Sequence, residues 1–192
     1  MKKIKLFSSI ILLATFTIGT NTIAQSKMKK EDTKMVGGAA MYPSKNIVEN
    51  AVNSKDHTTL VAAVKAAGLV DVLMSEGPFT VFAPTNDAFG KLPKGTVENL
   101  LKEENITTLQ TVLKYHVVAG KWSASDVMGM IKKGDGKAKI ETVSGAWLTA
   151  WTKGGDVYIT DENGNTAKVT IADVNQSNGV IHVVDTVLLP KS

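Results

Sequence analysis

The stretch that decides the fold runs from residue 137 to residue 189 and reads KAKIETVSGAWLTAWTKGGDVYITDENGNTAKVTIADVNQSNGVIHVVDTVLL. Apolar and polar side chains alternate in five segments of it, a pattern typical of half-buried β-strands. The five segments are 138–143, 146–151, 156–160, 167–174 and 179–189. Ser-Gly, Gly-Gly or Asn-Gly pairs separate each segment from the next. Such turn signals predict a succession of antiparallel hairpins.

Helical spacing precedes this strand half. Apolar residues recur every three or four positions in 47–52, 60–74, 96–101 and 106–115, and Gly68 and Gly77 stand where helices are expected to end. A short apolar segment, 79–82, predicts one strand among them. Helices followed by a meander of strands predict an α+β domain. A doubly wound nucleotide-binding fold would need strands that alternate with helices.

The composition excludes several classes of function. The chain has 192 residues, of which 43% are hydrophobic and 21% charged, a balance typical of globular proteins. It contains no Cys, which excludes thiol catalysis and Cys-ligated zinc. Its net charge of +4 comes from lysines near the beginning, because lysines and acids nearly balance from Ser44 onward and Arg is absent. We therefore expect no nucleic-acid partner.

The first 24 residues have the pattern of a signal peptide. A basic start is followed by the apolar stretch 6–18, and small residues precede Gln25. The apolar stretch is shorter than the ~20 residues that cross a bilayer. We expect cleavage before Gln25, no membrane span afterwards, and a secreted or periplasmic protein. Residues 25–43, rich in Lys and Gly, are expected to be a flexible tail, and 44–192 the folded domain.

Three segments carry a resemblance to a known family. They are TVFAPTNDAF at 80–89, LKYHVVAG at 113–120 and NGVIHVVD at 178–185. Their sequence, order and spacing are similar to the signature segments of the fasciclin domain family, and the likeness extends from about Ser44 to Pro190. The resemblance implies a β-wedge of mainly antiparallel strands packed against a helical layer. It also implies a role in cell adhesion or extracellular matrix contact, and it does not imply an enzyme. We expect no enzyme activity and no cofactor.

The motif residues have a structural interpretation that is independent of the family. Thr85 or Asn86 is placed to cap a helix, and Asp87 to face its first-turn amides. A catalytic interpretation would instead pair Asp87 with His116, as in half of a hydrolase triad. No nucleophile elbow accompanies them, so we expect a structural hydrogen-bond network that includes this pair. The residues expected to hold the motifs together are Thr85, Asn86, Asp87, His116, Asn178, Gly179 and His182.

Two pairs of residues are candidate binding positions. The resemblance implies adhesion contacts at Tyr115 and His116, with core packing as the alternative. Trp147 and Trp151 share one face of a predicted strand, whose other face carries Leu148. We expect the two indoles on the outer face, unless the helices or the tail cover them.

No metal site is expected. His57 and His182 are far apart in the sequence, and Asp185 falls on the strand face opposite to that of His182. The acids and amides at 161–165 resemble the start of a calcium loop, but Thr166 stands where the loop needs Gly and Ala172 where it needs Glu. A hairpin turn is the better interpretation of this segment.

The sequence therefore predicts a secreted, non-catalytic adhesion module in matrix or biofilm contact. Its expected partner is an extracellular protein or glycan, or a second copy of the chain. Two alternatives remain open: a carrier of a small apolar ligand between the helices and the strands, and a hydrolase that uses Asp87 and His116.

Overall fold

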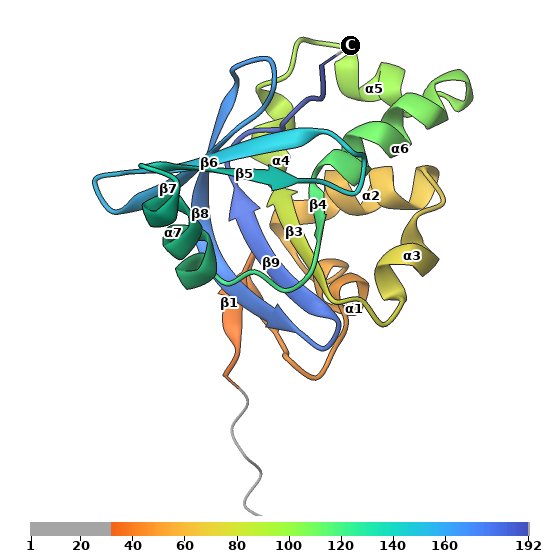
Figure 1. Ribbon diagram of the computed structural model, residues 1–192. Helices are drawn as coiled ribbons and strands as arrows, with labels where there is room; N and C mark the ends of the chain where they lie inside the picture. Colours follow the sequence, from red (N-terminus) through yellow and green to blue (C-terminus); the bar gives the residue numbers. More distant parts are fainter. Residues whose placement is uncertain (1–31, 192) are drawn as a thin grey trace, which may run out of the picture. The chain divides into compact units, whose positions relative to one another are not determined.

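The computed structural model describes residues 32–191 as helices around one large sheet (Figure 1). The helical elements are α1 (Ile47–Ala51), η1 (Lys55–His57), α2 (Thr58–Ala66), α3 (Val70–Met74), α4 (Asn86–Gly90), α5 (Thr96–Leu100), η2 (Glu103–Asn105), α6 (Ile106–Tyr115) and α7 (Ala124–Lys133). The strands are β1 (Lys34–Val36), β2 (Ala39–Met41), β3 (Phe79–Pro84), β4 (Val117–Ala119), β5 (Lys137–Glu141), β6 (Trp147–Lys153), β7 (Asp156–Thr160), β8 (Thr166–Gln176) and β9 (Gly179–Val184). The expected α+β class is confirmed.

The sheet has seven strands in the order β4-β3-β9-β8-β7-β6-β5. Every neighbouring pair is antiparallel except β3 and β9, which run parallel. The meander predicted from alternation is therefore present as β5 to β9, although the last strand ends at Val184 rather than at residue 189. The parallel pair joins the first helical half directly to the end of the meander.

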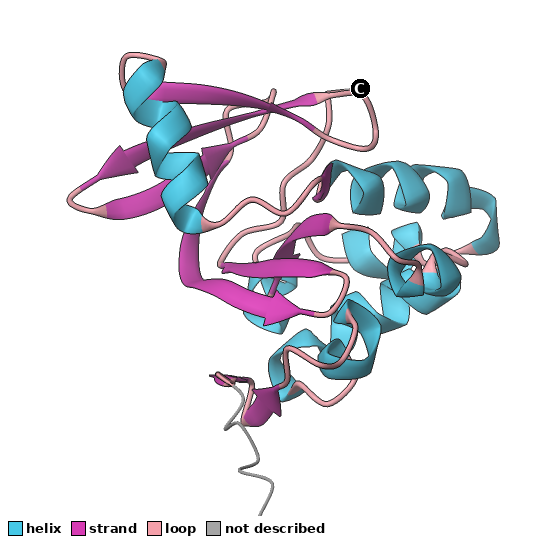
Figure 2. Cartoon of the chain, turned by 60° about the horizontal axis from the view of Figure 1, so that its bottom comes forward, coloured by secondary structure: helices cyan, strands magenta, loops and turns pink. Residues whose placement is uncertain are grey.

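The two larger of three apolar clusters lie on different sides of the sheet. One fills the space between α1, α2, α3 and α6 and the β3–β9 region, and the other lies between α7 and strands β5 to β8. Figures 1 and 2 both place α7 apart from the other helices, across the strands. The β5–β7 sheet thus has one covered face, where Leu148, Ala150 and Ile159 are fully buried.

Helix α7 was not predicted. It carries only Val127 and Ile131 into the core, since glycine, lysines and half-exposed methionines occupy much of the rest of its length. Its beginning was nevertheless marked, because Ser123 and Asp126 form a capping box with bonds in both directions.

The expected flexible tail at 25–43 is wrong for its second half. Residues 34–41 form the β1–β2 hairpin, which turns at Gly37 and Gly38, both with positive φ. Val36 and Met41 are each only 3% exposed, because they pack against the cluster under α1 and α2. Two buried apolar residues in three-residue strands are too short a pattern for periodicity to detect. The predicted signal peptide, and residues 25–31 of the predicted tail, lie outside the described residues.

Among residues 32–191, no helix is both long and apolar enough to cross a membrane.

Candidate functional site

The first motif segment holds helix α4 against the helices before it. Thr85 is the N-cap of α4, and its side chain accepts a hydrogen bond from the Ala88 amide. The side-chain oxygen of Asn86, Oδ1, accepts from the Thr59 amide at 3.0 Å, and its side-chain nitrogen, Nδ2, donates to the Lys55 carbonyl. Asn86 therefore ties α4 to η1 and α2, as a structural residue would.

The second motif segment places two buried rings at the end of α6. The Tyr115 hydroxyl donates to the Trp147 carbonyl at 2.9 Å and accepts from the Glu162 amide at 3.2 Å. His116 Nδ1 donates to the Val112 carbonyl, so Nε2 is free to accept from the Leu188 amide at 3.0 Å. Burial raises the pKa of Tyr115 to about 12 and lowers the pKa of His116. Both residues join α6 to distant strands and loops, and no surface partner can reach their rings.

The expected pairing of Asp87 with His116 is wrong. Asp87 is exposed in the first turn of α4, whereas both ring nitrogens of His116 are bonded to the backbone. The main acceptor in this region is the buried carboxylate of Asp161. The sequence alone predicted only a turn at this residue. Asp161 accepts from the amides of Asn163, Asn165 and Leu189 and so fixes the β7–β8 turn to the C-terminal segment.

The third motif segment connects α1 and α3 to the β8–β9 hairpin. Asn178 accepts from the Ile47 amide and donates to the carbonyls of Leu73 and Ser75. A Cβ at Gly179 would lie 2.1 Å from the Phe79 oxygen, so only glycine lets β3 and β9 approach this closely.

His182, within β9, is the remaining ring of that segment. Its Nε2 donates to the Trp122 carbonyl at 2.8 Å, its Nδ1 accepts from the Asp173 amide, and the ring stacks on Phe82. Asp173 adopts a left-handed conformation at the irregularity in β8 and accepts from the Ala124 amide at the start of α7. His182 therefore fixes the approach of α7 to the sheet.

The predicted tryptophan pair lies on the uncovered face of the β5–β7 sheet. Trp147 is 44% exposed. Trp151 is half-buried: it stands opposite Tyr158 on β7, the two rings stack with centroids 4.8 Å apart, and the indole N–H donates to Thr160 at 2.9 Å. We call Trp147, Trp151 and Tyr158 the aromatic face.

Lysines border the aromatic face. Lys137 on β5 stands opposite Trp151, and Lys139 stands opposite Thr149 between the two tryptophans; both lysines are exposed. Lys168 on β8 stands opposite Tyr158 but forms a 2.6 Å ion pair with Asp156. The exposed cationic side chains of Lys137 and Lys139 therefore lie along one edge of the rings, with Glu141 opposite Trp147 at the end.

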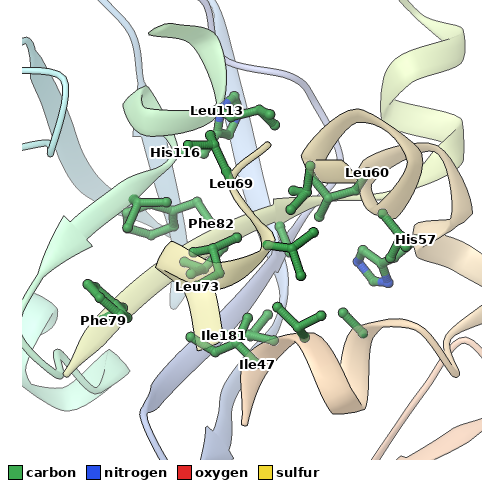
Figure 3. Close-up of a pocket in the computed structure, with 18 of the residues that line it drawn as sticks. Ile47, His57, Leu60, Leu69, Leu73, Phe79, Phe82, Leu113, His116 and Ile181 are labelled. Carbon is green, nitrogen blue, oxygen red and sulfur yellow. The ribbon is translucent and has the colours of Figure 1, made fainter. Parts of the chain in front are cut away.

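A separate apolar cavity of about 110 Å³ lies between the first helices and the sheet (Figure 3). Its wall is almost wholly apolar and comes from α1, α2, α3, α6, β3 and β9, with the β1–β2 hairpin closing one side. The labelled residues in Figure 3 are Ile47, His57, Leu60, Leu69, Leu73, Phe79, Phe82, Leu113, His116 and Ile181. His57 was not predicted as a site residue, and only the folded arrangement brings it to this wall.

Among the described residues, no group of three or more His, Asp or Glu side chains lies close enough together to hold a metal ion. Asp161, Asn163 and Asn165 bond to one another and to the C-terminal segment as a turn.

Comparison with known proteins shows which family this fold and these motifs resemble. Residues 55–190 match the model of the fasciclin domain. The chain is 46% identical to Protein sll1483 of Synechocystis sp. over 179 residues, which cover 93% of this chain and 92% of the relative. It is 37% identical to Immunogenic protein MPB70 of Mycobacterium bovis over 145 residues, which cover 73% of this chain and 66% of that protein.

Further matches include a cell adhesion molecule of known structure. The chain is 37% identical to pig (Sus scrofa) transforming growth factor-beta-induced protein ig-h3, over 68% of this chain but only 17% of that protein. A solved pair of FAS1 domains from the insect cell adhesion molecule fasciclin I superposes with a TM-score of 0.69 at 19% identity, over 77% of this chain and 52% of that one. The family thus includes proteins of adhesion and of the cell surface. With its three motifs joined as described and its model match over most of its length, the chain belongs to the fasciclin domain family.

Proposed function

We propose that this protein is a secreted, non-catalytic adhesion module that binds matrix or biofilm glycan through its aromatic face. The observation that carries the proposal is the exposure of Trp147 beside the stacked pair of Trp151 and Tyr158. Large aromatic side chains are enriched at binding hot spots, and an indole leaves a flat apolar face together with a polar edge. The opposite face of the same strands already packs against α7, so the core does not need these rings.

The chemistry of the face suits a sugar chain. Sugar rings present flat C–H surfaces that pack on aromatic faces, and their hydroxyls can pair with the threonines between the rings. Thr149 and Thr160 are half-exposed and stand opposite each other on β6 and β7. Lys137 and Lys139 add positive charge at the β5 edge, which favours a glycan that carries carboxylate or sulfate groups.

The family supports adhesion as the general role. Fasciclin I is an insect cell adhesion molecule, and MPB83 of M. bovis is a cell surface glycolipoprotein, 33% identical over 81% of this chain.

Secretion of this chain follows from the expected signal peptide. The intact mass of the protein recovered from its native host tests it, because a chain that keeps residues 1–24 would instead be anchored.

A glycan array probed with the purified protein tests the binding proposal. We expect signals from acidic polysaccharides that weaken as salt rises, since exposed charges are screened. Trp147→Ala should weaken binding at least tenfold while the melting temperature stays within a few degrees, because the bonds to Tyr115 and Glu162 use only the backbone of Trp147.

The matched control is Tyr42→Ala. Tyr42 is also a 40% exposed aromatic residue, but it precedes α1 and is not part of the aromatic face. Its loss should leave glycan binding unchanged. Equal binding by Trp147→Ala and wild type, or array signals from proteins or from a second copy of the chain in place of glycans, would contradict the proposal.

A further inference from the structure

The apolar cavity contains one polar atom without a partner. His57 is only 3% exposed, and its Nε2 is the one buried side-chain nitrogen or oxygen of the described residues that makes no hydrogen bond. The ring stands in the cavity wall (Figure 3), among side chains that offer almost no polar surface. Buried polar atoms are nearly always paired, and an exception calls for a missing partner.

The other side of the ring is fixed. Nδ1 pairs with the Ser54 hydroxyl at 2.8 Å, and Ser54 is itself 2% exposed. The β1–β2 hairpin covers this pair, since a Cβ at Gly37 would lie 2.2 Å from the Ser54 oxygen. His57 therefore cannot turn away to reach water without breaking a buried bond, and Nε2 remains on the cavity side.

The ring is neutral near pH 7. Burial lowers the pKa of His57, and the nearby backbone of Ala83 and the charge of Asp56 oppose that shift only in part. The Ala83 backbone opposes the shift as a hydrogen-bonding neighbour of the ring, but its geometry falls short of a full hydrogen bond to Nε2. A neutral imidazole offers one N–H donor and one acceptor, and the Ser54 hydroxyl can pair with either of them.

The geometry points to a ligand site. We propose that this cavity binds a small neutral alcohol or phenol, whose apolar body fills the cavity and whose hydroxyl pairs with His57 Nε2. A hydroxyl both donates and accepts, so it suits either tautomer of the ring. An ionised carboxylate would lose its hydration in a wall with almost no polar surface, so it fits poorly.

The size of the cavity sets the size of the ligand. At about 110 Å³ it approaches the engineered apolar cavity of 150 Å³ that accepts benzene. Access is available beside Val72 and Val143, two lining residues that are 52% and 47% exposed. A single six-membered ring or a short branched chain, with one hydroxyl, matches this volume.

Phenol and toluene are the paired probes, because they share a ring and differ in the hydroxyl. Binding to the purified protein is measured by calorimetry and by NMR shifts of the lining methyl groups. We expect both probes to bind, and we expect His57→Phe to weaken phenol about five- to tenfold relative to toluene, the size of one net hydrogen bond. The comparison of two probes in one protein cancels any change in the shape of the cavity. Phenol should also shift the ¹⁵N resonance of His57 Nε2, whereas toluene should not.

A second variant tests the cavity without touching His57. Ala51 lines the cavity, so Ala51→Leu should fill it and abolish binding of both probes. The control Val52→Leu changes the next residue, which is 49% exposed and outside the lining, and should bind as wild type does. The proposal is overturned if wild type binds neither probe, if His57→Phe leaves the ratio of phenol to toluene affinity unchanged, or if Ala51→Leu binds normally. Loss of glycan binding in Trp147→Ala with normal phenol binding would show that the two sites are independent.

Discussion

The buried histidines make the stability of this fold depend on pH. All three histidines of the chain are buried, at 3% exposure or less, and burial lowers the pKa of each of them. The carbonyls of Val112 and Trp122, which accept from these rings, oppose the shift at His116 and His182. The second ring nitrogen of each of the two residues accepts a hydrogen bond from a backbone amide. Protonation of that nitrogen would replace a hydrogen bond with a clash of two donors.

Stability should therefore fall on acidification. Below the unfolded-state pKa of about 6.5 the unfolded chain takes up protons that the folded chain does not, so the free energy of unfolding decreases as pH falls from about 7. Each histidine contributes up to about 1.4 kcal/mol per pH unit until its folded pKa is reached. Urea unfolding at pH 7.5, 6 and 5 measures this slope.

His116→Gln isolates the share of one residue. Whatever its stability at pH 7.5, the variant should lose about one histidine's part of the slope between pH 6 and 5. A slope identical to that of wild type would mean that His116 does not titrate on unfolding, contrary to the buried neutral ring described above.

At the scale of elements, the parallel contact between β3 and β9 depends on a residue without a side chain. The Phe79 oxygen leaves no room for a Cβ at Gly179. Because a backbone oxygen within a sheet cannot move aside, Gly179→Ala should destabilise the protein by about 3 kcal/mol or more. Chemical denaturation at a constant m-value measures the loss.

Gly129→Ala is the matched control for this change. Gly129 lies within α7, and a Cβ there would meet no atom within 4 Å. Removing glycine from a helix interior should stabilise the protein by about 0.5–1 kcal/mol. Equal effects of the two substitutions would contradict the role of close strand approach at Gly179.

The elements differ in how well sequence predicts them. The strands β5 to β8 followed from alternation, since each has one face toward α7 and one toward solvent. Strand β9 is buried along its whole length, and its parallel neighbour is about a hundred residues away in the chain, so local patterns could not pair it. The register that stacks Trp151 on Tyr158 is set by the short β6–β7 turn between Lys153 and Asp156, and it was not predicted from the sequence.

The candidate sites also have one part that the sequence predicts and another that depends on the folded arrangement. The shared face of Trp147 and Trp151 was readable from a period of two, but their exposure depended on which helix covers the other face. The unpaired nitrogen of His57 had no signal in the sequence, because it arises from Ser54, the β1–β2 hairpin and the cavity wall together.

At the scale of the whole molecule, the folded domain begins earlier than Ser44. The β1–β2 hairpin buries Val36 and Met41 in the helical cluster, and Lys34 donates to the Ala172 carbonyl at 2.6 Å. The backbone of Tyr42 makes two bonds with the side chain of Asn50, which is 1% exposed. The hairpin together with Tyr42 therefore completes both an apolar wall and a buried polar contact.

Chains that begin at Asp32 and at Ser44 test this boundary. Burial of a Val or Met side chain contributes about 1.5–3 kcal/mol. Loss of the Tyr42 amide, from which Asn50 Oδ1 accepts, adds a further cost. The chain from Ser44 should thus lose about 4 kcal/mol or more, a large part of the 5–15 kcal/mol that keeps a typical domain folded. The chain from Asp32 should melt as the longer protein does. Because Val36 and Met41 also line the cavity, Met41→Ala in the longer protein should lower the melting temperature and enlarge the space beside His57. Equal melting of the two shortened chains would mean that the hairpin adds nothing to the core, and the domain would then begin where the sequence alone predicted it.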